Sequence, residues 1–148
     1  MNEMEELYRE IILDHNKRPR NFRKMEGHTH HADGHNPLCG DEIEVFVKVE
    51  DGKIVDISFQ GEGCAISKSS ASLMTTALKG KTLDEAKKEC DIVVSMLSGK
   101  SEASAADELG DIAALQGVRQ FPARIKCATL SWHTLEESLN GGEKASTE

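Results

Sequence analysis

The chain has 148 residues, a formal net charge of −8 at pH 7 and 38% hydrophobic residues. A chain of this length can bury a core without disulfides or a structural metal, so we expect one domain over residues 1–140 and a disordered polar tail over 141–148. The acidic balance argues against a nucleic-acid partner, because phosphate binding needs clustered Lys and Arg.

The first residues, MNEMEE, have neither the basic start nor the apolar core of a signal peptide. No apolar run approaches the length that spans a membrane. We therefore expect a cytoplasmic protein without a membrane partner. In that reducing compartment the four cysteines are expected to be metal ligands or reactive thiols rather than disulfides.

The N-terminal part of the chain predicts a helix followed by a loop. Apolar residues recur every three or four positions over residues 4–15, and Pro19 ends this helix. We expect His15, at the end of the apolar stripe, to lie in the core or to cap the helix. Residues 27–37 show no periodicity and predict a solvated loop, in which His35 is notable for its closeness to Cys39. That loop carries four histidines: His28, His30, His31 and His35.

Two segments, 42–49 and 54–60, alternate between apolar and polar residues and predict a β-hairpin. A two-residue turn at Asp51 and Gly52 would put the apolar faces of the two strands on opposite sides of the ribbon. We therefore prefer a three-residue loop over 50–52, which pairs Val45 with Ile57. Both registers leave residues 39, 41 and 64 at the open end of the hairpin.

The second half of the chain predicts helices. One covers residues 66–78, ends at Gly80 and has Cys64 at its N-terminus. Thr82 and Glu85 form a capping box for the next, over 83–97, where Cys90 is expected to fill the core. Residues 101–110 predict a polar, weakly helical connection with one helical segment, and residues 111–117 predict a short capped helix.

The final helix is predicted to begin at Pro122. Cys127 lies in an early turn, off the apolar stripe, and Arg124 precedes it on the same helical face. The stripe expected to be buried comprises Phe121, Ile125, Ala128, Trp132, Leu135 and Leu139. The predicted fold class is thus α+β: a small antiparallel sheet built on a β-hairpin, packed against an N-terminal helix and a bundle of C-terminal helices.

Three cysteines and one aspartate occupy places that suit metal binding. Cys39 and Asp41 are two apart on an extended chain and therefore point the same way. Cys64 and Cys127 lie near helix N-termini, where the partial positive charge favours the thiolate. Together these residues form a set of three sulfurs and one oxygen that would satisfy tetrahedral zinc. The alternative is three unrelated reduced thiols in a stable α+β domain.

Three motifs resemble the cysteine motifs of the U-type iron–sulfur cluster assembly proteins, the family of NifU N-terminal and IscU-like domains: NPLCGD at 36–41, GEGC at 61–64 with Ser67 after it, and IKC at 125–127. The likeness covers about residues 4–139. The ending FPARIKCATLSW at 121–132 and the longer stretch around 80–82 are similar to the SufU branch. Lys126 stands where IscU proteins carry a histidine, and their LPPVK chaperone motif is absent.

The resemblance implies a zinc-bound sulfur shuttle, an accessory protein that activates a cysteine desulfurase. Cys39, Asp41, Cys64 and Cys127 would hold zinc, and Cys39 would accept persulfide sulfur from a SufS-type cysteine desulfurase for downstream SUF cluster-assembly proteins. Arg124 is a candidate for steering the persulfide or the desulfurase, and the alternative is a plain surface cation. Two alternatives stay open: a scaffold that assembles a 2Fe–2S iron–sulfur cluster on the same thiols, and a structural zinc module that only binds a partner.

Overall fold

The computed structural model describes residues 3–99 and 103–146. Residues 101–102 of the predicted polar connection and 147–148 of the predicted tail lie outside this part. The predicted α+β class is confirmed, while the single-domain organisation over 1–140 stays a prediction.

The elements in chain order are α1 (Glu3–Lys17), β1 (His30–Asn36), β2 (Asp41–Glu50), β3 (Lys53–Glu62), α2 (Ala65–Leu78), α3 (Leu83–Leu97), the 3₁₀ helix η1 (Ala103–Gln120), α4 (Pro122–Leu139) and β4 (Lys144–Ser146).

The strands form one four-stranded sheet in the order β3-β2-β1-β4. β1, β2 and β3 pair antiparallel, as the predicted small antiparallel sheet requires, and the short strand β4 adds a parallel pairing to β1 that makes the sheet mixed. β4 also lies in the stretch predicted to be a disordered tail. That prediction fails there because the edge of β1 offers unpaired backbone groups to the end of the chain.

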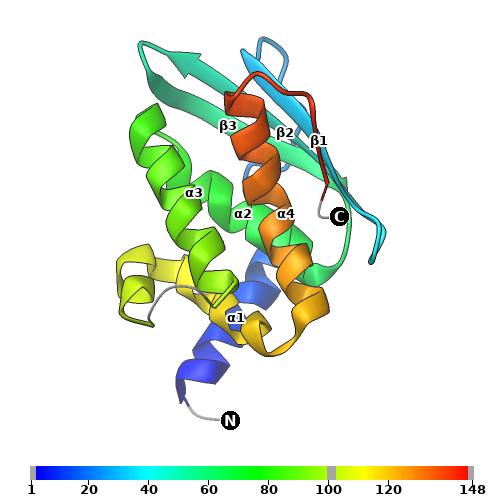
Figure 1. Ribbon diagram of the computed structural model, residues 1–148, viewed down its shortest axis with the longest axis vertical. Helices are drawn as coiled ribbons and strands as arrows, with labels where there is room; N and C mark the ends of the chain where they lie inside the picture. The colour runs from blue at the N-terminus through cyan, green and yellow to red at the C-terminus, as the bar shows by residue number, and fades with distance from the viewer. Residues whose placement is uncertain (1–2, 100–102, 147–148) are drawn as a thin grey trace.

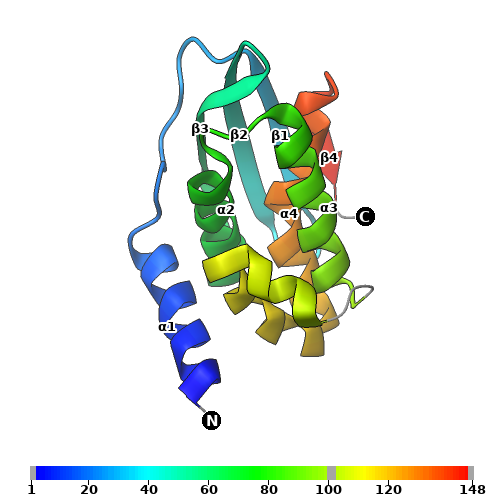
Figure 2. The ribbon, with the colours of Figure 1, turned by 90° about the vertical axis from the view of Figure 1, so that its left-hand side faces the viewer.

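In the described part of the chain, the helices all lie on one side of the sheet (Figures 1 and 2). α2 packs against β3, and α4 packs against β1 and β2. α3 lies beside α4, and α1 packs against α2 and η1. Among the described residues, no helix is both long enough and apolar enough to cross a membrane.

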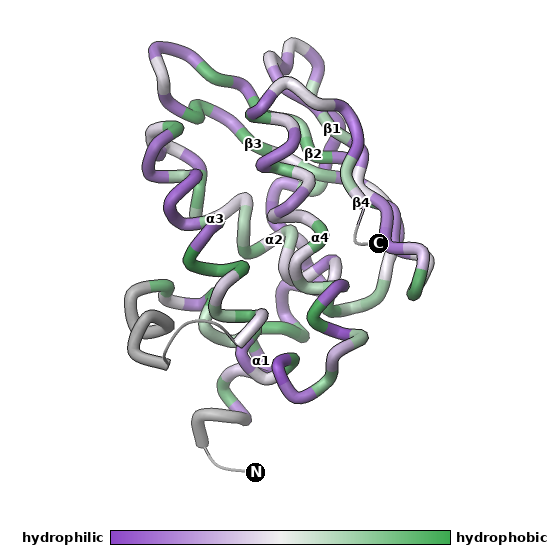
Figure 3. Tube along the Cα trace, in the orientation of Figure 1, coloured by the Kyte–Doolittle hydropathy of each residue, from purple (hydrophilic) through white to green (hydrophobic). Residues whose placement is uncertain are grey.

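The β2–β3 hairpin places the apolar side chains of both strands on one face, as predicted, but with a different turn and register. Asp51 and Gly52 both have positive φ, at 52° and 74°, and form the two-residue turn that the sequence analysis rejects. A bulge between positions 48 and 49 then shifts the register, so Val45 pairs with Phe59. The bulge restores one apolar face to the ribbon, and both strands carry hydrophobic and hydrophilic residues in mixed order (Figure 3).

The predicted histidine loop contains a strand, β1, so the loop prediction is wrong for residues 30–36. Ala32, Gly34 and Asn36 are buried toward the helices, and the residues between them face outward. His31 and His35 therefore share one strand face, although their spacing was expected to follow none. The strand escapes sequence reasoning because its buried positions hold small or polar residues.

The helices follow their predicted boundaries closely. Cys64 is the N-cap of α2, and the capping box of Thr82 and Glu85 opens α3 as predicted. Cys90 is fully buried, and burial raises the pKa of its thiol. His15 is also buried, with its Nδ1 2.7 Å from the Ser72 hydroxyl. These core assignments are confirmed.

Two predictions for the C-terminal half need correction. Phe121 is exposed rather than buried, because it precedes the first turn of α4 as its N-cap. The predicted short helix over 111–117 is part of η1, which is broken at Gly110 by a non-helical backbone conformation. Trp132 is fully buried as predicted, and its Nε1 donates a 3.0 Å hydrogen bond to the Ser70 hydroxyl.

We expect Gly34→Ala to lower the free energy of unfolding by about 1–3 kcal/mol, measured by denaturant titration. A Cβ at Gly34 would overlap the Thr134 hydroxyl and lie 3.2 Å from Leu130 Cδ1, where α4 contacts β1. Its matched control is Gly117→Ala, because nothing lies within 4 Å of the added Cβ there. In a Thr134→Ala background the cost of Gly34→Ala should be smaller. Equal effects of Gly34→Ala and Gly117→Ala would contradict this packing.

Candidate metal centre

The turn between β1 and β2 places Cys39 and Asp41 at one end of the sheet. The Gly40 N–H donates a 2.8 Å hydrogen bond to the Asn36 carbonyl, and Gly40 has a φ of +74°. Such a backbone conformation favours glycine, which explains the residue between the two candidate ligands. Cys39 is exposed at the turn, whereas Asp41 begins β2 and is fully buried.

The buried Asp41 carboxylate is held by two neutral donors. Its Oδ2 accepts a 3.0 Å hydrogen bond from the Asn36 amide, and its Oδ1 accepts a 2.8 Å bond from the Cys64 backbone N–H. A Cβ at Gly63 would lie 2.8 Å from the same Oδ1, so only glycine permits this approach. The hydrogen bonds offset part of the cost of burying a carboxylate and fix the direction of its oxygens.

Cys127 reaches the same place from α4. It is fully buried, and its Sγ lies 3.4 Å from the Cys39 Sγ. The Asn36 Nδ2 approaches the same sulfur at 3.5 Å. Because α4 packs along β1 and β2, the helix brings residue 127 beside the β1–β2 turn. The expected convergence of these distant segments is therefore present in the fold.

The structure brings three of the four predicted ligands into one cluster. The donor atoms of Cys39, Asp41 and Cys127 all lie within 4.8 Å of one another. Cys64 is adjacent, but its sulfur accepts a 3.5 Å hydrogen bond from the Ser67 N–H at the start of α2 and lies outside that cluster. His35 does not join either, because it pairs with Glu42 and faces outward.

The donor set fits zinc chemistry. Two thiolates that each bind zinc at about 2.3 Å with tetrahedral angles lie about 3.8 Å apart, close to the separation of the Cys39 and Cys127 sulfurs. Burial raises the pKa of the Cys127 thiol, and hydrogen bonds with Cys39, Asp41 and Cys64 raise it further. The expected stabilisation of the Cys127 thiolate by the helix N-terminus is therefore not met, since residue 127 lies beyond the first turn. A divalent cation would supply the missing positive charge.

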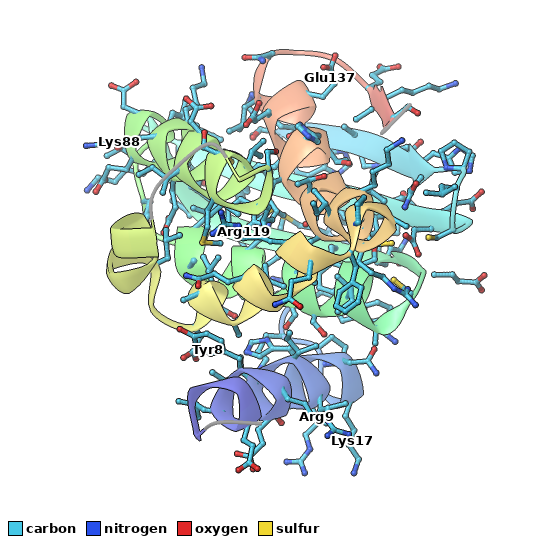
Figure 4. The ribbon with its side chains drawn as sticks, turned by 60° about the horizontal axis from the view of Figure 1, so that its bottom comes forward. Tyr8, Arg9, Lys17, Lys88, Arg119 and Glu137 are labelled. Carbon is cyan, nitrogen blue, oxygen red and sulfur yellow. The ribbon has the colours of Figure 1, made fainter. Side chains whose placement is uncertain are left out.

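Arg124 and an apolar groove border the cluster. The guanidinium of Arg124 is exposed, and the neighbouring Cys64 and Cys127 sulfurs raise its pKa. A groove of about 720 Å³ runs from Cys64 and Arg124 to α1, where Ile12 and Tyr8 line it. Tyr8 lies on the side of α1 that faces the other helices, whereas Lys17 projects outward (Figure 4). The cluster is thus flanked by a cation on one side and apolar surface beyond it.

Asn36 supports the candidate centre, a role that the sequence analysis does not predict. Its fully buried amide donates both to the Asp41 carboxylate and to the Cys127 sulfur, so it joins two candidate ligands from different elements. In the sequence, Asn36 is indicated only by its place at the start of the NPLCGD motif, a few residues before Asp41. That signal is usable only when β1 is recognised as the strand that pairs with β2.

We expect Asn36→Ala to lower the unfolding free energy of the metal-free protein by about 1–3 kcal/mol, since the buried Asp41 carboxylate loses a donor. The control is Gln60→Ala, which removes another amide–carboxylate bond, to Glu44 at 3.0 Å, from a part-buried position on the opposite sheet face. That variant should change stability by less than about 0.5 kcal/mol. Denaturant unfolding in a chelator measures both, and equal losses would contradict a special role for Asn36.

Comparisons with known proteins agree with these motifs. The NifU-like N terminal domain model matches residues 7–128. The chain is 47% identical to the zinc-dependent sulfurtransferase SufU of Bacillus subtilis, covering 92% of this chain and 91% of the relative. It is 41% identical to the iron–sulfur cluster assembly scaffold protein IscU of Streptococcus pyogenes serotype M1, covering 98% and 90%. A crystal structure described as a putative cluster assembly scaffold for the SUF system of Fervidobacterium islandicum superposes with a TM-score of 0.81 at 36% identity, covering 88% and 94%. The family resemblance seen in the sequence is therefore confirmed, and the chain belongs to the NifU-like N-terminal domain family.

Proposed function

We propose that the chain is a zinc-dependent sulfur shuttle of cytoplasmic iron–sulfur cluster assembly. The observation that carries the proposal is the contact of an exposed Cys39 thiol with the buried Cys127 thiol beside the buried Asp41 carboxylate. One thiol can meet a partner while the other donors stay shielded. The name of the Bacillus subtilis relative, a zinc-dependent sulfurtransferase, supports the same activity.

In this proposal Cys39, Asp41, Cys64 and Cys127 hold the zinc. When bound, zinc would keep the thiols deprotonated and shield them from oxidation. Asn36 orients the Asp41 carboxylate, and the Cys64 N–H fixes its second oxygen. The protein thereby presents its donors in a nearly preformed arrangement, with the Cys64 sulfur next to the cluster.

The transfer step uses Cys39 as the acceptor of persulfide sulfur. Its thiolate attacks the terminal sulfur of a persulfide on a SufS-type cysteine desulfurase, and a new S–S bond forms at Cys39. The sulfur–sulfur bond in the donor breaks, and the donor cysteine leaves as a thiolate. The exchange needs no added oxidant or reductant. Arg124 stabilises the negative charge that the persulfide carries, because its exposed guanidinium lies beside the centre.

Apolar surface around the centre supports docking of the desulfurase. Leu38, Phe121 and Leu13 are exposed at 61%, 59% and 51%, and exposed apolar surface that is contiguous marks interaction sites. Phe121 and Leu13 line the groove that ends at Cys64. The proposal places the desulfurase over this surface and assigns the later transfer of sulfur to downstream SUF cluster-assembly proteins.

A cluster scaffold is the second candidate function, and the name of the Streptococcus pyogenes relative favours it. The two functions use the same thiols but differ in what they carry. A scaffold would become coloured when loaded with iron and sulfide, because the cluster absorbs visible light. A shuttle would instead carry sulfur as a persulfide on one cysteine.

The test of sulfur transfer incubates the protein with a SufS-type desulfurase and cysteine, then locates the added sulfur by peptide mass. We expect one added sulfur on Cys39 and faster desulfurase turnover. Cys39→Ser should abolish both, because a hydroxyl cannot form the persulfide.

The matched control for that experiment is Cys90→Ala, which removes a buried thiol far from solvent. It should keep the sulfur transfer of the wild type once folding is verified. Sulfur found only on Cys127, or a coloured cluster without persulfide on Cys39, would contradict the proposed sulfur-shuttle function.

We also expect about one zinc per chain in protein purified without added metal, by elemental analysis. Asp41→Ala should lose at least about tenfold in zinc affinity, measured by competition with a chelator, because a charged ligand is removed. Asp91→Ala removes an exposed carboxylate on α3 and serves as the control. Equal zinc affinity of both variants would remove Asp41 from the site.

A further inference from the structure

A second group of metal-binding side chains lies on the face of the sheet opposite the helices. His31 and Asp33 extend outward from β1, and Glu44 extends from β2 directly opposite Asp33. His31 Nε2 is 3.1 Å from Glu44 Oε2 and 3.3 Å from Asp33 Oδ1. One donor atom from each of the three residues lies within 4.8 Å of the other two.

Neighbouring side chains hold two of these residues in place. The His31 ring packs on the Phe46 ring, with centroids 4.8 Å apart and an interplanar angle of 34°. The Gln60 amide donates a 3.0 Å hydrogen bond to Glu44 Oε1, which leaves Oε2 directed at His31. Such outer contacts orient metal ligands and fix the nitrogen or oxygen that is presented.

The two negative charges of this group favour the binding of a cation. Asp33 and Glu44 are paired across antiparallel strands, where two like charges opposite one another are destabilising. Within the described residues, neither carboxylate forms an ion pair with Lys or Arg, and the basic side chain in contact with both is the His31 imidazole. A divalent ion between the carboxylates would neutralise both charges and accept the imidazole nitrogen.

We propose that His31, Asp33 and Glu44 bind a divalent transition-metal ion at a site separate from the cysteine centre. Ligands that each lie about 2.0–2.2 Å from one ion are about 3.0–3.5 Å apart in octahedral or tetrahedral geometry, which matches the two nitrogen–oxygen separations. One imidazole with two carboxylates is a harder donor set than thiolates, so it takes ions such as Mn²⁺ or Fe²⁺.

The exposure of the site makes the ion exchangeable. The side chains of His31, Glu44 and Asp33 are 28%, 40% and 54% exposed, so water can complete the coordination sphere. The cysteine centre differs, since Asp41 and Cys127 are fully buried on the helix-facing side. The two sites therefore differ in the softness and charge of their ligands and in the access of solvent to them. This inference does not depend on the proposed sulfur transfer.

The experiment uses Mn²⁺ as the probe, because manganese favours oxygen and imidazole ligands over thiolates. Titration of the full chain, followed by the electron paramagnetic resonance signal of free Mn²⁺, gives the stoichiometry and Kd. We expect one saturable site. In amide NMR spectra, substoichiometric Mn²⁺ should broaden the signals of His31, Asp33 and Glu44 before those of the β1–β2 turn.

His31→Ala and Glu44→Gln should each weaken Mn²⁺ binding at least about tenfold, since loss of an outer-shell partner alone costs about 10–100-fold. The matched control, His30→Ala, removes the neighbouring imidazole, whose residue pairs with Val47 on the other strand face, and should leave the Kd unchanged. Circular dichroism checks that each variant folds. Absence of saturable binding, equal Kd values in wild type and His31→Ala, or broadening first around Cys39 would each overturn the proposal.

Discussion

The buried carboxylate of Asp41 is the constraint on which the candidate centre depends. No Lys or Arg in the described residues forms an ion pair with it. Its hydrogen-bond donors include an amide from β1, a backbone N–H from the start of α2 and the Cys127 thiol. A buried charge held only by neutral donors is costly unless a cation completes the site. The strand, the hairpin and the helix start must therefore meet at one point, and a metal ion is the natural fourth participant.

The other donors differ from Asp41 in how firmly the fold holds them. Cys127 lies on a helix packed against the sheet, and it is as buried as Asp41. Cys39 lies in a turn and is exposed, so it can leave the cluster with the least disturbance of packed structure. This gradient suits a centre in which one sulfur reacts while the rest of the site stays in place. The Cys64 sulfur, which accepts a hydrogen bond from the Ser67 N–H, adds another thiol beside this cluster.

Sequence reasoning succeeded where the pattern is strong and failed where packing decides. The capping box of α3, the start of α4 at Pro122 and the buried positions of Cys90 and Trp132 follow from local signals. The hairpin shows a subtler case, because the requirement for one apolar face was correct while the turn length was wrong. A bulge can also place the apolar side chains of both strands on one face, but no residue between positions 48 and 55 predicts a bulge.

The sequence predicted the grouping of three of the four candidate ligands but not the residue that supports them. Cys39, Asp41 and Cys127 meet as the motifs indicate, yet Asn36 needed β1, a strand without apolar periodicity. Burial also overrode the expected effect of the helix N-terminus on Cys127, because desolvation acts on the whole side chain while the dipole fades beyond the first turn.

The alternation of side chains along β1 explains how one short strand contributes to two different candidate sites. Asn36 faces inward and supports the sulfur-rich centre, whereas His31 and Asp33 face outward and form a nitrogen–oxygen group with Glu44. Because side chains on a strand alternate, these two sets cannot mix without a register shift. The backbone of β1 therefore separates soft ligands from harder ones over a few residues. A metal ion held on the outer face would have to leave that face before it could reach the thiols.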